Sequence, residues 1–60
     1  MQLNRVSAYE MVCACCGRWR VETSYGPYGA YHIVKRDGQI MGYAYGTDHE
    51  VAEKVREMKR

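Results

Sequence analysis

The sequence contains no phenylalanine, only 1 proline and no long apolar run. Without such a run no helix can cross a bilayer, and residues 1–5 lack the apolar segment of a secretory signal. The net charge is also small. The 9 Lys and Arg are nearly balanced by 7 Asp and Glu, which leaves a net charge of +2. A field this weak does not identify a nucleic-acid-binding protein. We therefore expect a cytoplasmic protein with no membrane partner.

The cysteines are clustered. The chain has 3 cysteines, Cys13, Cys15 and Cys16, an odd number with no distant partner. This pattern argues against the disulfide framework of secreted domains and favours reduced thiols. Cys13 and Cys16 form a C-x-x-C step. A redox role for them is disfavoured, because the pair falls near the end of an expected helix, whereas a low-pKa thiolate favours a helix N-terminus.

Signals for metal binding and catalysis are weak. Two of the cysteines with His32 or His49 could complete a zinc site, yet structural zinc domains usually present two separated ligand pairs. The sequence leaves zinc binding open as an alternative and predicts no cofactor. Neither histidine has a neighbouring nucleophile and orienting acid that the sequence identifies, so we expect no catalytic residues and no enzymatic activity.

Tyrosine is abundant instead, with 6 residues beside 1 tryptophan. Rings with a polar tip serve interfaces as well as cores. The 60 residues form one small domain (residues 1–60), and a chain of this length buries only about 60% of the surface that its unfolded form exposes. Its marginal stability would gain from a partner or from a second copy.

The strongest local signal is Asp37-Gly38, which suits the two-residue turn of a hairpin between residues 30–36 and 39–45. A regular hairpin around this turn fixes which side chains share a face. One face then carries the pairs Lys35 with Ile40, Ile33 with Gly42 and Tyr31 with Ala44, and the other carries Val34 with Met41, His32 with Tyr43 and Ala30 with Tyr45.

Residues 47–50, Thr-Asp-His-Glu, match a capping box, in which the threonine hydroxyl and the glutamate carboxylate each satisfy a backbone amide at a helix start. Val51, Val55 and Met58 follow at helical spacing and form an apolar stripe. The pattern predicts a helix over about residues 48–59.

A second capping pattern, Ser7-Ala-Tyr-Glu10, precedes another apolar stripe at helical spacing, and Gly17 stands in the position of a C-cap. These signals favour a short helix over residues 8–16. A strand is the competing interpretation, because Val and Cys tolerate extended structure and so short a helix is marginal alone.

Residues 18–25 alternate with period two, which predicts a half-buried strand, and Gly26-Pro-Tyr-Gly29 predicts a turn into the hairpin. The element order becomes α-β-β-β-α. We therefore expect an α+β domain with a three-stranded antiparallel sheet and both helices on one face.

The helices are expected to cover the hairpin face on which small residues let a helix approach closely. The surface expected to lie under the helices, which we call the expected floor, consists of Trp19, Val21, Tyr31, Ile33, Ile40, Gly42 and Ala44. The mirror arrangement, which covers Val34, Met41 and Tyr43 instead, is the alternative. The face left open mixes aromatic, Met and Arg side chains, which are enriched in protein hot spots. Its predicted partner-binding residues are Arg18, Arg20, His32, Val34, Arg36, Met41, Tyr43 and Tyr45.

By element order, the chain resembles double-stranded RNA-binding domains, with Gly29-Ala-Tyr-His32 at the place where their second strand begins. That family holds phosphates with a basic cluster that opens its last helix. The matching residues 47–50 of this chain include Asp48 and Glu50, which would repel phosphate.

The C-terminal half resembles a different group. The hairpin from Tyr31 to Tyr45, followed by a helix with Val51-Ala52 and Val55, looks like the β-β-α core of small phage-encoded anti-defence proteins, among them anti-CRISPR inhibitors. The resemblance implies a one-domain protein that acts by stoichiometric binding and occludes a surface of a host nucleoprotein machine, such as a CRISPR or other defence complex.

From these residues we expect a non-enzymatic protein-binding inhibitor or adaptor that uses the open sheet face. Three alternatives stay open. They are a single-stranded or double-stranded nucleic-acid-binding module on the same face, a homodimer closed by that face, and a small zinc-binding domain.

Overall fold

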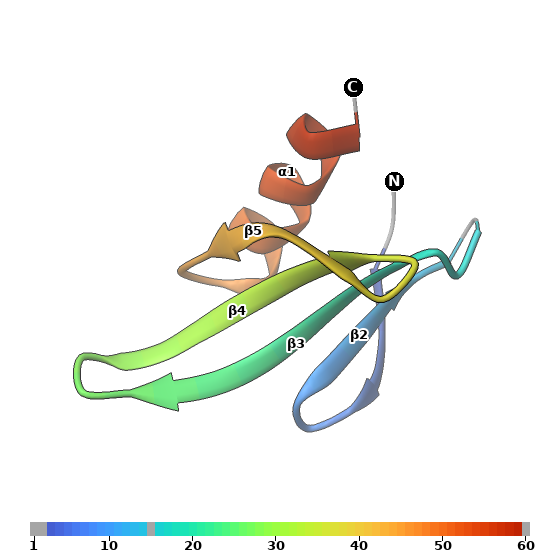
Figure 1. Cartoon of the computed structure of the whole chain (residues 1–60). Helices are drawn as coiled ribbons and strands as arrows, with labels where there is room; N and C mark the ends of the chain where they lie inside the picture. The colour runs from blue at the N-terminus through green and yellow to red at the C-terminus, as the bar shows by residue number, and fades with distance from the viewer. Residues whose placement is uncertain (1–2, 15, 60) are drawn as a thin grey trace.

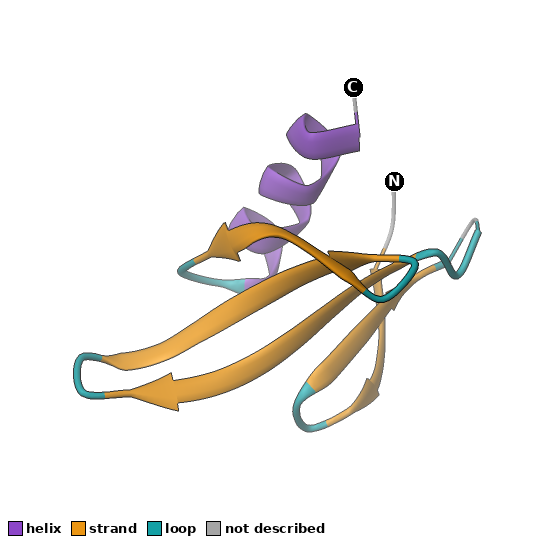
Figure 2. Ribbon diagram, in the orientation of Figure 1, coloured by secondary structure: helices purple, strands orange, loops and turns teal. Residues whose placement is uncertain are grey.

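The computed structural model describes residues 3–14 and 16–59, which form a five-stranded antiparallel sheet and a C-terminal helix (Figure 1). The elements are β1 (Leu3–Ser7), β2 (Glu10–Cys13), β3 (Trp19–Gly26), β4 (Gly29–Arg36), β5 (Gln39–Ala44) and α1 (Asp48–Lys59). Successive strands are neighbours in the sheet (Figure 2). The expected three-stranded sheet with the order α-β-β-β-α is wrong, because the predicted helix of residues 8–16 is replaced by strand β2 and residues 3–7 add a further strand. The competing strand interpretation is correct for Glu10–Cys13.

The N-terminal segment forms the hairpin of β1 and β2. Met11 and Cys13 of β2 are each only 3% exposed, and they are two positions apart, as the buried face of a strand requires. The Ser7 hydroxyl accepts a hydrogen bond from the Tyr9 amide at 3.2 Å, so it closes a turn and does not cap a helix. Pairing with β3 gives the backbone amides and carbonyls of β2 hydrogen-bond partners on a neighbouring strand. A short isolated helix would have to be stable without such support.

The predicted turn at Asp37-Gly38 is confirmed. The φ angles of Asp37 and Gly38 are 51° and 84°, which is the left-handed conformation that a two-residue hairpin turn of type I′ requires. Next to the turn, Lys35 lies opposite Ile40, as the regular register predicts.

One extra residue in β5 changes the register beyond that pair. Lys35 lies opposite Ile40, whereas Val34 lies opposite Gly42, so Met41 is the extra residue of a β-bulge. A shift of one residue moves side chains to the other face of a sheet. Gly42 therefore shares a face with Val34, and the register predicted for the rest of the hairpin is wrong.

Helix α1 covers the face of the sheet that carries Val34, and the core lies between them. The buried core consists of Met11, Cys13, Trp19, Val21, Val34, Ala44, Val51 and Val55. The expectation that small residues of β5 let the helix approach closely is confirmed, because a Cβ atom on Gly42 would lie 2.8 Å from the Cε of Met58. We call this side of the sheet the covered face.

Three residues of the expected floor lie elsewhere. Tyr31 and Ile33 alternate along β4 with the buried His32 and Val34, so they occupy the opposite face, and Ile40 is 51% exposed. The expected cover over these three residues is therefore wrong. The mirror alternative is also wrong in part, because Val34 is covered but the exposed fractions of Met41 and Tyr43 are 39% and 49%.

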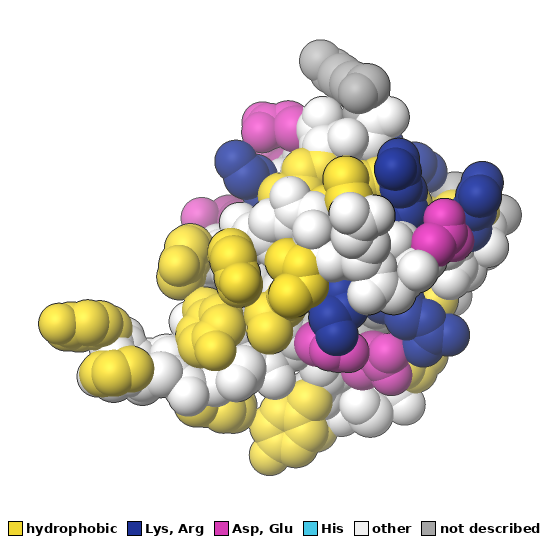
Figure 3. Space-filling view, viewed as in Figure 1, with side chains coloured by type: hydrophobic (Ala, Val, Ile, Leu, Met, Phe, Trp, Pro, Cys, Tyr) yellow, Lys and Arg dark blue, Asp and Glu magenta, His cyan; other side chains and the backbone are white. Residues whose placement is uncertain are grey.

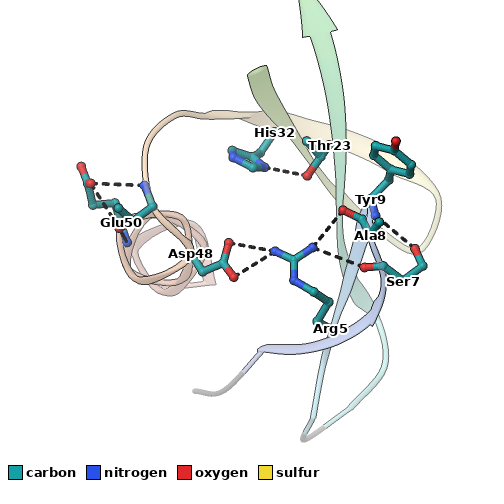
Figure 4. Close-up of polar contacts among 9 residues, drawn as sticks. Arg5, Ser7, Ala8, Tyr9, Thr23, His32, Asp48 and Glu50 are labelled. Carbon is teal, nitrogen blue, oxygen red and sulfur yellow. Dashed lines mark hydrogen bonds and ion pairs between the residues drawn. The ribbon is translucent and has the colours of Figure 1, made fainter. Parts of the chain in front are cut away.

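Helix α1 begins and ends where the sequence predicts. The Thr47 amide donates to Glu50 Oε1 at 3.2 Å, and the Glu50 amide donates to Thr47 Oγ1 at 3.3 Å, so both halves of the capping box are formed (Figure 4). Val51 and Val55 are fully buried. Within the described residues no helix has the length and apolar character needed to cross a membrane.

An ion pair joins the first strand to the helix. The Nη2 atom of Arg5 lies 2.9 Å from each carboxylate oxygen of Asp48, and Arg5 Nη1 donates to the Ala8 carbonyl at 3.1 Å (Figure 4). Because Asp48 stands in the first turn of α1, the contact holds the β1–β2 hairpin against the start of the helix.

Candidate functional site

The face of the sheet opposite α1, which we call the outer face, carries a group of apolar and aromatic side chains on β4 and β5. We call this group the outer patch; it consists of Tyr31, Ile33, Ile40, Met41 and Tyr43. Their common face follows from the register, since Ile33 lies opposite Tyr43 and the two residues of a bulge project to the same side as their single partner, Lys35. The rings of Tyr31 and Tyr43 lie 6.2 Å apart between centroids.

The outer patch is accessible over much of its area. Ile40, Met41 and Tyr43 are 51%, 39% and 49% exposed, and Tyr31 and Ile33 are half-buried between their neighbours. In the space-filling view, hydrophobic side chains gather in this region and continue toward the tip of the β3–β4 hairpin (Figure 3). Contiguous exposed apolar surface of this kind marks interaction sites more often than scattered single residues do.

The hairpin tip extends the patch. Tyr28, in the β3–β4 turn, is 103% exposed. A cavity of about 210 Å³ lies beside it and is lined by Gly26, Pro27, Tyr28, Gly29, Ala30, Tyr31 and Tyr45. Because this cavity includes Tyr31 of the outer patch and Tyr45 beyond β5, the aromatic surface is continuous from the middle of β4 to the tip.

The charged residues of the outer face are paired. Lys35 Nζ lies 2.9 Å from Glu22 Oε2, and Arg20 Nη1 lies 2.9 Å from Glu10 Oε2. These pairs lie on β2, β3 and β4 beside the apolar area, where blue and magenta side chains adjoin in Figure 3. Each pair cancels its own charge, so this part of the face is not a basic stripe of the kind that binds phosphates.

The other border of the patch is acidic. A groove of about 460 Å³ separates the end of β5 from α1 and is lined by Tyr43, Ala44, Tyr45, Glu50, Glu53, Lys54 and Glu57. Three glutamates and one lysine give this border a net negative charge. Tyr43 belongs to both the patch and the groove, so the aromatic surface meets the acidic one at this side chain.

The structure divides the predicted partner-binding residues among several places. Arg20, Met41 and Tyr43 lie on the outer face, and Tyr45 lines the adjoining groove. Arg18, whose Nε lies 3.4 Å from Asp37 Oδ1, stands just before β3.

The other three predicted residues lie on the covered side. The guanidinium carbon of Arg36 lies 5.8 Å from the centre of the Trp19 ring. Val34 is fully buried in the core and His32 is 7% exposed, so the expectation that they face an open surface is wrong. The cause is the alternation of β4, which places both under α1.

The preferred arrangement missed Tyr28, Tyr31, Ile33 and Ile40 as surface candidates, although the mirror alternative exposed the side that carries Ile33. A signal for their position was present in the turn before β4. With Pro27 and Tyr28 as the two turn residues, Val21 must lie opposite Val34, and the structure has this pair. Since Val21 was expected in the core, the same turn would have placed Val34 there and Ile33 on the outer face.

The candidate ligands of the alternative zinc site do not form a group of three in the described part of the chain. His32 Nδ1 and Thr23 Oγ1 share a hydrogen bond of 2.9 Å, and His49 Nε2 lies 3.2 Å from Glu53 Oε1 (Figure 4 shows the first contact). Among residues 3–14 and 16–59, no three His, Cys, Asp or Glu side chains are grouped to hold a metal ion. Cys15 lies outside the described residues.

Comparison with protein-family models, with curated proteins and with solved structures gives no match for this chain. The resemblance to double-stranded RNA-binding domains also loses its basis, because it depended on the order α-β-β-β-α, which the five strands replace.

Proposed function

We propose that this chain is a non-enzymatic protein-binding inhibitor or adaptor, and that the outer patch is its docking surface. The observation that carries the proposal is the exposure of Ile40, Met41 and Tyr43 together on one sheet face. Aromatic residues and Met are enriched at the centre of protein interfaces. Aromatic rings bury much apolar area with few rotamers to fix, and the flexible Met side chain adapts to the shape of the partner.

The size of the chain determines what share of its surface a standard protein interface would cover. A standard interface buries about 800 Å² on each partner, which is about a fifth of the 4137 Å² accessible surface of this protein. The outer patch alone is smaller than this. The interface therefore includes the hairpin tip around Tyr28 and the acidic groove beside Tyr43.

The acidic charge of the groove favours a partner protein with basic side chains at the contact. Glu53 and Glu57 border the patch on the side of α1, and the ion pairs on the other side are neutral. Complementary charge favours a partner protein that presents an apolar area bordered by Lys or Arg side chains.

A nucleic-acid-binding protein has basic surfaces of this kind around its groove. Together with the resemblance of the hairpin and helix to phage-encoded anti-defence inhibitors, this supports a host nucleoprotein complex, of the CRISPR or another defence type, as the partner. We place the interaction in the cytoplasm, which clustered reduced thiols favour.

The test compares two double variants of the full chain. Y43A/Y45A removes the rings where the patch meets the groove. Y9A/Y25A is the matched control, because these two tyrosines are also exposed and contact each other edge to face. Tyr25 stands four positions after the buried Val21 in β3, so it shares the face of Val21 and lies off the outer face. Thermal melting of both variants checks that the fold is kept.

Proteins captured from a host extract are first identified and then purified, and binding of each is measured by calorimetry. We expect Y43A/Y45A to weaken the specific partner by about 100-fold or more and Y9A/Y25A to change it less than about threefold. Equal losses in both variants would refute this docking surface. A chain that binds only oligonucleotides, with affinity falling steeply as salt is added, or that only dimerises, would refute the proposed function.

A further inference from the structure

The connection between β2 and β3 holds two thiols at contact distance. The Sγ atoms of Cys13, the last residue of β2, and Cys16, in the loop that follows, lie 3.5 Å apart. The Gly17 amide donates to the Cys13 carbonyl at 3.0 Å, and Gly17 has a φ of 68°, so the loop folds back on the end of the strand. The backbone therefore keeps the two sulfurs together, and the Cys16 thiol donates a hydrogen bond to Cys13 Sγ without a disulfide between them.

We propose that Cys13 and Cys16 form a reversible dithiol–disulfide site that is oxidised by a low-molecular-weight disulfide of the glutathione type. The two thiols differ in access, since Cys16 is exposed and Cys13 is buried at the edge of the core. This difference assigns the roles. Cys16 meets the reagent from solution, and Cys13 resolves the intermediate from inside.

The exchange takes two steps. The Cys16 thiolate attacks one sulfur of the small disulfide, which forms a mixed disulfide and releases one small thiol. Cys13 then loses its proton and attacks Cys16 Sγ, which forms the intrachain bond and releases the second small thiol. Two protein thiols are oxidised by two electrons, and one small disulfide is reduced to two thiols. The sulfurs close from 3.5 Å to about 2.0 Å when the bond forms.

The structure gives the pair a different setting from the predicted one. The sequence placed the pair near the end of a helix, whereas Cys13 ends a strand and Cys16 lies in an open loop. A bond between residues so near in sequence closes a very short loop and restricts the unfolded chain little. The bond would therefore report the redox state of the β2–β3 connection and would add little to the stability of the fold.

The experiment uses the full chain and two serine variants. Protein is equilibrated with oxidised and reduced glutathione at several ratios, free thiols are alkylated at acid pH, and the tryptic peptide of residues 6–18 is analysed by mass spectrometry. This peptide holds all 3 cysteines. C16S removes the exposed partner, and C15S is the matched control, because it removes the third thiol and leaves the pair intact.

We expect the parent chain and C15S each to lose two thiols and about 2 Da, which corresponds to one intrachain bond, and to recover both thiols with excess reductant. C16S should form no intrachain bond. Thermal melting of C16S should match the parent, because the side chain is exposed. An intrachain bond in C16S, failure of C15S to form one, or glutathione adducts alone in the parent would overturn the proposal.

Discussion

Val21 of β3 lies directly opposite Val34 of β4, and both side chains are fully buried beneath α1. This pair decides which face of the sheet is the core. It also divides β4 into two series, since Val34 points into the core while its neighbour Ile33 points to the outer face.

Replacing the two neighbours in turn tests this division. We expect Val34→Ala to lower the free energy of unfolding by about 2 kcal/mol, because it opens a cavity in a closed core. Ile33→Ala, although it removes more carbon, should cost less than about half as much, because Ile33 is only half-buried. Urea unfolding measures both. The reverse order of the two values would mean that the faces are assigned wrongly.

The capping box of α1 gives a second prediction. Thr47→Ala removes the hydroxyl that accepts from the Glu50 amide, and we expect a loss of about 1 kcal/mol in the free energy of unfolding. Thr47→Ser keeps the hydroxyl and serves as the control, with a change below about 0.5 kcal/mol. If serine and alanine are equally destabilising, the hydroxyl does not stabilise the helix start.

The contact of Arg5 with Asp48 is best tested with a double-mutant cycle. The two side chains are 40% and 62% exposed, so solvent and salt screen their attraction. From R5A, D48A and the double variant we expect a coupling of about 0.5–1 kcal/mol at low salt, which decreases in high salt. A coupling that is zero at low salt would show that the pair does not hold the first hairpin to the helix.

In the β4–β5 turn we expect substitution of Gly38 to lower stability and substitution of Asp37 by asparagine to be tolerated. Gly38→Ala places a Cβ on a residue with φ of 84°, where no neighbouring atom lies within 4 Å, so its cost of roughly 1–2 kcal/mol comes from the backbone alone. Asp37→Asn should change stability by less than about 0.5 kcal/mol, because asparagine accepts this conformation. Thermal melting curves of the two variants provide the comparison, and a neutral Gly38→Ala would contradict the assigned turn.

Local signals with few competing solutions were predictable from the sequence. Asp37-Gly38 and the capping box at Thr47 each satisfy backbone groups within a few residues, so neighbouring residues suffice to identify them. The same is not true of Ser7 and Glu10, which match a capping box in sequence. Here β2 gains a ladder with β3 from more distant residues, and Glu10 pairs with Arg20.

The candidate surface was predictable only in part. Met41 and Tyr43 were identified as exposed, but the reason lies in an extra residue of β5 that no turn signal announces. Gly42 was interpreted as a place for close helix contact, which is correct, although glycine within a strand is also typical of a bulge. His32 and Val34 were misplaced because the predicted hairpin was regular throughout.

The bulge at Met41 makes the register of β5 as important as its composition. If the same residues paired without a bulge, Met41 would lie opposite Val34 and Gly42 opposite Ile33, so that Tyr43 would turn inward against α1 while Gly42 and Ala44 turned to solvent. Variants that keep this register keep Tyr43 on the outer face and Gly42 under α1, and circular permutation or loop insertion is better placed at the other strand connections.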